Sequence, residues 1–174
     1  MKNCLIPGIL LAGLIYLCSC NSEDEIDRLE NKIRKKVWKI AEDYAVSNLS
    51  DSKKSVLENN LTVIGNDQKK YLLDPSRLFI GCVDEDTIND AIFTLYPFLN
   101  DYEVTSEHLF IINTDGKFLL IRAVESDMRV IRIENGVITA EIPEHTRNSP
   151  LFNCPSCWEV VKYRFSKGEL VRIE

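Results

Sequence analysis

The stretch HLFIINTDGKFLLIRAV, residues 108–124, decides the fold that we expect. It holds two apolar or alternating runs, 108–113 and 117–124, that have the length of β-strands. Between them stands Thr114-Asp115-Gly116, whose residue types tolerate positive φ or bond their own backbone. A connection this short joins only antiparallel neighbours, so the stretch predicts a β-hairpin.

The C-terminal side of this hairpin repeats the pattern. Further strands are predicted at 128–133, 137–142, 158–165 and 169–173. Asn135-Gly136 and Ser166-Lys167-Gly168 predict tight turns within two of the pairs. The polar segment 143–155 is the exception, because it is long enough to cross over a sheet. This half of the chain therefore predicts an antiparallel meander.

The N-terminal side begins with a helical pattern. Apolar residues recur at every third or fourth position, which is typical of an amphipathic helix. They are Ile26, Leu29, Ile33, Val37, Ile40 and Tyr44. A short second helix is predicted from Ser50-Asp51-Ser52 to about Glu58, and a third from Asp86 until Pro97 ends it.

Strands are predicted between the second and third helices. The runs 61–64 and 71–73 flank Gly65-Asn66-Asp67 and predict a hairpin that ends at Pro75, and 78–83 predicts a buried strand. The fold class expected from this order is α+β, with N-terminal helices packed on one face of an antiparallel β-meander. The order resembles a cystatin-like or nuclear-transport-factor-like curved sheet around a helix, a likeness that implies no function.

Composition and charge limit the classes of function. The chain has 174 residues, is 45% apolar and carries a net charge of −6, as ordinary globular proteins do. This acidic balance argues against nonspecific nucleic-acid binding, which needs clustered Lys and Arg. Six basic residues fall among the predicted C-terminal strands: Arg122, Arg129, Arg132, Lys162, Arg164 and Arg172. We expect a solvated face with cross-strand partners at Glu134, Glu141 and Glu159, and the alternative is a basic strip for anionic sugars or a protein partner.

The N-terminus has the pattern of a secretory signal. Lys2 precedes an uncharged run over 4–17, which as a helix would be about 21 Å long and too short for a bilayer core of about 30 Å. Leu17-Cys18-Ser19-Cys20 resembles the lipobox of bacterial lipoproteins, in which the signal is cut before a Cys that carries diacylglycerol. The resemblance implies a signal peptide over residues 1–19 and a lipid on Cys20 that anchors the chain to a membrane.

The residues after Cys20 bear on localisation. Ser22-Glu23-Asp24-Glu25 resembles the export signal that sends lipoproteins of Bacteroidota to the outside of the outer membrane. The competing interpretation is a helix start, with Ser22 as N-cap and Glu25 as its capping-box partner. We expect a surface-exposed outer-membrane lipoprotein, with the periplasmic face as the alternative. In domain terms, residues 20–25 form an acidic tether and residues 26–174 a single α+β domain.

Cys154-Pro155-Ser156-Cys157 is the strongest local motif, and it is compatible with a redox centre, a zinc site or a disulfide. A redox centre needs a helix N-terminus to lower the thiol pKa, but the motif runs into a predicted strand. A zinc site needs further ligands, which only Cys82, His108 and His145 offer. Export makes a structural disulfide the expected state. We expect Cys154–Cys157, with Cys82 as the alternative partner and otherwise a buried thiol.

The remaining candidate residues have weaker patterns. Asp84-Glu85-Asp86 with Asp90 invites a calcium interpretation, but the glycine and final Glu of a calcium loop are absent, and acids at a helix N-terminus explain them better. Surface or packing roles are expected for His108 and His145. The sequence contains no nucleophile elbow, phosphate-binding glycine loop or dinucleotide fingerprint.

These observations predict a noncatalytic, lipid-anchored binding or interaction module of the cell envelope. Its expected partners are the membrane, through Cys20, and a protein or glycan ligand, with no cofactor and no nucleic acid. The alternatives are a thiol-disulfide protein that uses Cys154 and Cys157, and an envelope hydrolase whose carboxylates the sequence does not mark.

Overall fold

A computed structural model describes residues 22–57, 60–66, 68–84, 86, 88–99, 102–103, 105–144, 154 and 157–173. The chain divides into two compact units, residues 1–35 and 36–174. The single helix among the described residues, α1 (Ser22–Ser47), begins in the first unit and ends in the second.

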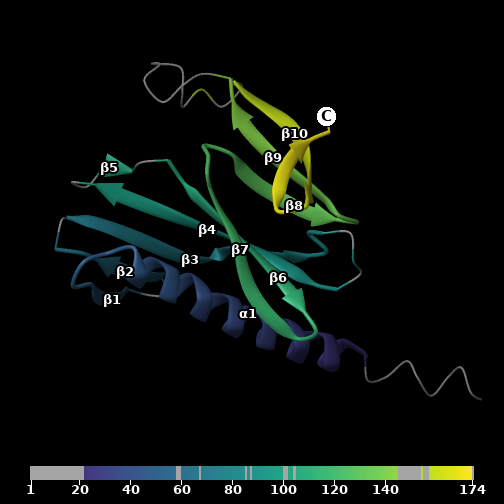
Figure 1. Cartoon of the computed structure of the whole chain (residues 1–174), viewed down its shortest axis with the longest axis horizontal. Coiled ribbons are helices and arrows are strands. Elements are labelled where there is room, and N and C mark those ends of the chain that lie inside the picture. The colour runs from purple at the N-terminus through teal and green to yellow at the C-terminus, as the bar shows by residue number, and fades with distance from the viewer. Residues whose placement is uncertain are drawn as a thin grey trace, which may run out of the picture. The chain divides into compact units, whose positions relative to one another are not determined.

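Antiparallel strands make up most of this unit (Figure 1). They are β1 (Lys53–Leu57), β2 (Asn60–Ile64), β3 (Lys69–Gly81), β4 (Asp90–Leu99), β5 (Tyr102–Glu103), β6 (Glu107–Thr114), β7 (Lys117–Glu125), β8 (Arg129–Glu134), β9 (Val137–Pro143), β10 (Trp158–Ser166) and β11 (Glu169–Arg172). Seven of them form the large sheet, in the order β1-β2-β3-β4-β6-β7 with β5 paired to β4. The other four form the small sheet, in the order β11-β10-β9-β8.

The centre of the large sheet is buried on both faces. In β4, all residues from Ala91 to Leu95 are buried. One face meets the C-terminal half of α1, where Trp38 packs edge-on against Phe93 with ring centroids 5.7 Å apart. Tyr44 packs in the same manner on Tyr71, at 6.4 Å. These ring contacts, together with the fully buried Val37, Ala41 and Ala45, hold the second half of α1 against the sheet.

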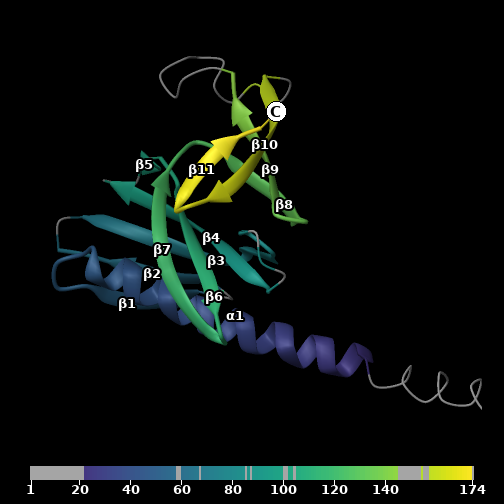
Figure 2. The ribbon, with the colours of Figure 1, turned by 45° about the vertical axis from the view of Figure 1, so that its right-hand side comes forward.

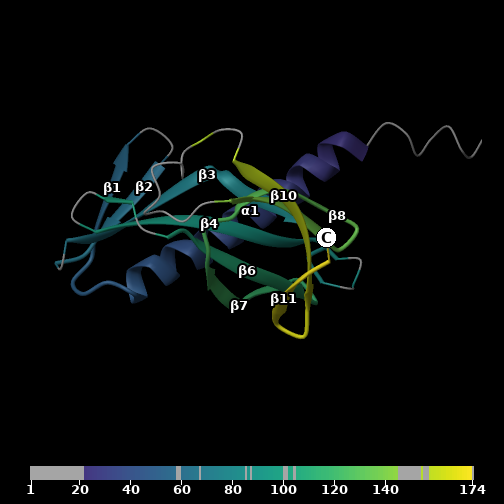
Figure 3. The same cartoon turned by 90° about the horizontal axis from the view of Figure 1, so that it is seen from above.

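The other face of the large sheet meets the small sheet. The stacked rings of Phe110 on β6 and Phe165 on β10, 4.7 Å apart, lie within the core between the two sheets. A Cβ placed at Gly81, the last residue of β3, would come within 3.0 Å of Ile133 on β8. The sheets therefore approach closely at this point. Figure 2 shows β7 as a long curved strand, and Figure 3 shows the strands of the small sheet lying at an angle across those of the large one.

Three tight turns confirm the turn predictions. Asp115-Gly116, Asn135-Gly136 and Lys167-Gly168 each connect two paired strands, and all six residues have positive φ. Two consecutive residues with positive φ match the right-handed twist of a hairpin, and Gly and Asn adopt that conformation most readily. Every strand predicted between 108 and 173 is present, to within about two residues at each end.

Two predicted helices are wrong. Residues 53–57 form β1, and the segment expected to be a helix after Asp86 forms β4. The apolar positions of the second segment fit a helical period, but a strand buried on both faces also has a continuous apolar run, and periodicity cannot separate the two. The α+β class is confirmed in its coarse form, as antiparallel sheets with one helix where several were expected. The single meander expected is divided into two sheets.

Two further predictions on connections are wrong. The strand expected to end at Pro75 continues through it, because β3 resumes its pairing with β4 at Leu78 after an irregularity. The segment 143–155 was expected to cross the sheet, but β9 and β10 are direct neighbours, with Trp158 opposite Pro143. Residues 145–153 lie outside the described residues, whereas the strands on either side pair as a hairpin with a long connection.

Candidate functional site

A cleft of about 820 Å³ opens between the large and the small sheet. The residues that line it come from β3, β4, β8, β10 and the segments before β6 and β8. They are Leu72, Asp74, Arg77, Phe79, Thr94, Tyr96, Phe98, Ser106, Asp127, Met128, Arg129, Val130 and Trp158. A volume of roughly 300–1,000 Å³ is usual for ligand-binding clefts, so this one has the size of a small-molecule site. We refer to it below as the cleft.

Strand alternation places the floor of the cleft. Successive side chains of a strand point to opposite faces, so Thr94, Tyr96 and Phe98 share one face of β4. Phe93, on the opposite face, meets Trp38 of α1. In β3, Leu73 pairs with Leu95 and Leu78 pairs with Phe93, so residues 74–77 together stand opposite Thr94 alone. This bulge supplies Asp74 and Arg77 to the cleft.

Each of the two arginines of the cleft lies over an aromatic ring. The Arg129 guanidinium is 3.8 Å from the centroid of the Trp158 ring, and that of Arg77 is 5.6 Å from the centroid of Tyr96. Cation–π contact holds each guanidinium by its face and leaves the N–H groups at its edge directed outward. Arg77 Nε also lies 4.0 Å from Asp74 Oδ2. The charged side chains of the lining are Arg77, Arg129, Asp74 and Asp127, two basic and two acidic.

A buried histidine stands opposite Thr94 on the neighbouring strand β6 and on the same face of the large sheet. His108 on β6 is fully buried, with Nδ1 3.0 Å from Thr94 Oγ1 and Nε2 3.2 Å from the Ser126 carbonyl oxygen. Burial disfavours the imidazolium and lowers the pKa of His108 from 6.5 to about 4. Both ring nitrogens have partners, so His108 fixes the position of the Thr94 hydroxyl.

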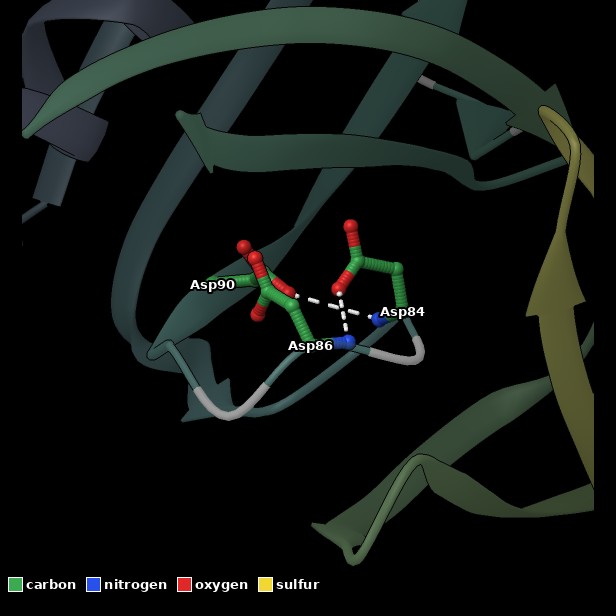
Figure 4. Close-up of side chains that lie close together, drawn as sticks. All are labelled: Asp84, Asp86 and Asp90. Carbon is green, nitrogen blue, oxygen red and sulfur yellow. Dashed lines mark hydrogen bonds between the residues drawn. The ribbon is translucent and has the colours of Figure 1, made fainter. Parts of the chain in front are cut away.

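Three aspartates in the connection between β3 and β4 lie close together (Figure 4). The carboxylate oxygens of Asp84, Asp86 and Asp90 lie within 4.8 Å of one another, and this is the one group among the described residues with the spacing of metal ligands. The predicted helix N-terminus is wrong here, because a strand follows. Glu85 lies outside the described residues.

Backbone hydrogen bonds account for the positions of these aspartates. Asp84 Oδ1 accepts from the Asp86 N–H at 3.0 Å, and Asp86 Oδ1 accepts from the Ile88 N–H at 2.7 Å. Asp90 is fully buried and accepts from the N–H groups of Val83 and Asn113, both at 2.9 Å. Burial raises the pKa of Asp90, and these hydrogen bonds oppose that rise. The three carboxylates thus order the connection.

Glu107, the first residue of β6, belongs to no motif of the sequence. The residue is 4% exposed, and its carboxylate accepts the hydroxyl protons of Tyr44, at 2.8 Å, and Tyr71, at 2.9 Å. Lys69 Nζ lies 4.0 Å away. Burial and the nearby carboxylate raise the pKa of both tyrosines well above the ordinary 10. This cluster ties α1 to β3 and β6, and its signal in the sequence was an acid at the start of a strongly apolar run.

The structure places the predicted cysteine and histidine sites as follows. Cys154 and Cys157 lie at disulfide distance, with their Cα atoms 5.2 Å apart, and Cys82 is free and half-buried. Cys82 and His108 do not belong to any metal-ligand group among the described residues. His145 and Cys20, with the rest of residues 1–21, lie outside the described residues.

The basic residues of the C-terminal strands have the predicted kind of partner in one case. Arg172 on β11 pairs across strands with Glu159 on β10, at 2.5 Å, whereas Arg132 pairs at 3.5 Å with Glu134 of its own strand, β8. Arg122 donates to the Gly168 carbonyl oxygen at 2.7 Å. Three of the six residues therefore make these local contacts, whereas Arg129 lines the cleft.

Comparison of the chain with models of known families, with curated proteins and with solved structures finds no match. Within the described part of the chain, no helix has both the length and the apolar character of a membrane span. The site must therefore be interpreted from its own geometry.

Proposed function

We propose that this chain is a lipid-anchored protein of the bacterial cell envelope whose cleft binds a ligand without transforming it. The observation that carries the proposal is the cleft itself, where four aromatic and four charged side chains converge on one open volume of about 820 Å³. A cleft of this size in which aromatic rings and polar groups converge is typical of a ligand site. The shifted titratable group nearest to it, His108, is fully buried and engaged at both nitrogens, which favours binding over acid–base catalysis.

The anchor rests on Leu17-Cys18-Ser19-Cys20 and its resemblance to a lipobox. Cys20→Ala should leave the precursor uncut and unlabelled by radioactive palmitate, whereas the wild-type chain is cut and labelled. A labelled mature Cys20→Ala protein would contradict the anchor. Protease treatment of intact cells separates surface display, which the acidic run after Cys20 favours, from the periplasmic face.

The cysteine pair is proposed to be a structural disulfide. Cys157 directly precedes β10, so the helix dipole that lowers the pKa of a redox-active thiol is absent at this position. A peptide map of the non-reduced, full-length chain should contain a Cys154–Cys157 cross-link. Reduction of insulin by the purified chain would instead favour the thiol-disulfide alternative.

Ligand binding in the cleft is tested on the full chain, purified in detergent, with a panel of four chemical classes. The panel comprises neutral oligosaccharides, oligogalacturonate, dipeptides and a medium-chain fatty acid. A member present at a hundredfold excess over its Kd should raise the Tm by about 5–10 °C. Tyr96→Ala should abolish the shift, whereas Phe118→Ala, which changes an aromatic ring outside the cleft, should retain it. Hydrolysis of a panel member, or no shift with any of them, would overturn the proposal.

We also retain as a proposal the finer likeness of the fold, a curved sheet around a helix as in cystatin-like and nuclear-transport-factor-like proteins. The large sheet and the second half of α1 support it through the Trp38–Phe93 and Tyr44–Tyr71 contacts. The small sheet is an addition to that arrangement.

A further inference from the structure

We propose that the ligand of the cleft is a neutral oligosaccharide. This inference rests on the proposed function, because it requires the cleft to be the binding site. It follows from three properties of the lining: the aromatic rings, the balance of charges and the way in which the arginines are held.

The aromatic rings supply apolar surface to the cleft. Phe79, Tyr96, Phe98 and Trp158 line it, and each is only partly buried. A cation already lies over one face of Phe98, Tyr96 and Trp158, so a ligand meets these three rings by the other face or by the edge. An aromatic face carries partial negative charge and stacks well on the C–H groups of a flat, saturated ring. A pyranose presents such C–H groups on its faces and hydroxyls around its edge. Several rings along one cleft therefore fit a chain of sugar units.

The charges of the cleft match hydroxyl groups better than ions. Asp74 and Asp127 accept hydrogen bonds, and Arg77 and Arg129 donate them. A sugar hydroxyl both donates and accepts, so it satisfies either partner, with the added strength of a charged group. A multiply charged anion would approach two carboxylates, and a polycation two guanidiniums. Because the four charges sum to zero, a neutral ligand suits this lining best.

The arginine donors are fixed before a ligand arrives. Arg129 rests on the Trp158 ring at 3.8 Å, and no carboxylate pairs with it within the described part of the chain. The guanidinium is thus held by its face, and its edge N–H groups form no ion pair with a described residue. Donors held in advance reduce the ordering cost of binding, which matters for a ligand whose individual hydrogen bonds are weak.

Other ligand classes fit less well. An acyl chain would remove four charged groups from water without returning a hydrogen bond to any of them. A peptide that binds as an added strand needs an open sheet edge, and of the strands that line the cleft only β8 has one, because β3, β4 and β10 have partners on both sides. Nucleic acid needs a net basic surface, which this lining lacks.

Titration calorimetry on the full chain, in detergent, with the four-class panel tests the inference. The neutral members are linear β-1,4-glucan, α-1,4-glucan, β-1,4-mannan and chitin tetrasaccharides. We expect at least one neutral tetrasaccharide to bind more tightly than its own monosaccharide, since the cleft accommodates more than one ring. We expect oligogalacturonate, dipeptide and fatty acid to bind at least about tenfold more weakly.

Two substitutions and two matched controls locate the site. Trp158→Ala and Arg129→Gln should each weaken binding of that tetrasaccharide by about five- to tenfold, through loss of a platform and of a donor. The control for Trp158→Ala is Val160→Ala, because Val160 lies on the same strand, is 59% exposed and is outside the cleft. The control for Arg129→Gln is Arg132→Gln, because Arg132 lies on the same strand and pairs with Glu134 at 3.5 Å. Both controls should bind as the wild-type chain does.

The outcomes separate the two proposals. Tightest binding of an acidic, zwitterionic or apolar member, weakened by Trp158→Ala or Arg129→Gln, would overturn the neutral sugar and keep the cleft as the site. Binding that neither substitution changes would overturn the cleft as the site, and with it both proposals. Arg129→Gln keeps the test valid if Trp158→Ala fails to fold, since Arg129 is exposed.

Discussion

Lowering the pH from 7 to 4 should destabilise the fold through His108. This side chain is fully buried, and its Nε2 lies 3.2 Å from the Ser126 carbonyl oxygen. A carbonyl oxygen only accepts, so Nε2 carries the proton and Nδ1 accepts the Thr94 hydroxyl at 3.0 Å. The folded chain therefore holds a neutral imidazole whose pKa is lowered from 6.5 to about 4 by burial.

The sign and size of the effect follow from that difference in pKa. Between the folded pKa of about 4 and the unfolded value of 6.5, the unfolded chain binds a proton that the folded chain does not. The contribution of His108 is thus complete above pH 6.5 and is lost as the pH falls toward 4. At about 1.4 kcal/mol per unit of pKa, the total loss is about 3 kcal/mol.

Urea unfolding of the full chain at several pH values from 7 to 4 measures this loss. His108→Gln keeps a donor and an acceptor but does not titrate, so its stability should fall less steeply than that of the wild-type chain. The chain has two histidines, so His145→Gln leaves a single imidazole whose NMR signal should titrate near pH 4. A midpoint near 6.5 for that signal, or equal slopes for His108→Gln and the wild-type chain, would refute the reasoning.

Three other perturbations test the contacts between elements. Tyr71→Phe should lower the free energy of unfolding in urea by about 1.5–3 kcal/mol, because it removes a donor from the buried Glu107 carboxylate. Tyr44→Phe should lower it less, because Tyr44 is more exposed, and the reverse order would contradict this prediction. The pKa values of Tyr44 and Tyr71 are raised above 10, so these tyrosines ionise in the unfolded chain before they ionise in the folded one. The free energy of unfolding should therefore fall as the pH rises above 10, and a value that stays constant up to pH 11 in the wild-type chain would contradict this prediction. Gly81→Ala should lower the free energy of unfolding in thermal melts by about 1–3 kcal/mol, because the new Cβ would lie 3.0 Å from Ile133. An unchanged Tm would contradict the close approach of the two sheets at this residue.

The small sheet could be predicted from the sequence because its turns are chemically marked. Asn135-Gly136 and Lys167-Gly168 adopt positive φ, and the strands beside them begin and end within about two residues of the predicted positions. The centre of the large sheet could not be predicted in this way. Ala91 to Leu95 are all buried, so the alternation that identifies a strand with one wet face is missing.

The cleft could not be predicted, because it joins residues that are distant in the chain. Tyr96 and Trp158 lie on strands of different sheets, and nothing in a single sequence indicates that these strands face one another. Arg129 was recognised only as one member of a basic set. Its contact with Trp158 reaches from β8 to β10 across β9, so it depends on the pairing of three strands of the small sheet.

One sequence feature of the cleft was visible but was interpreted as the end of a strand. Pro75 has no N–H to donate to the ladder, and the Ser76 N–H bonds Asp74 Oδ1 at 2.8 Å instead of β4. Residues 74–77 consequently bulge out opposite Thr94, and the bulge brings Asp74 and Arg77 to the cleft. In a regular antiparallel pairing, alternate side chains of this segment would point toward α1. The bulge instead supplies the cleft with an acceptor, Asp74, and a donor, Arg77, from the same strand.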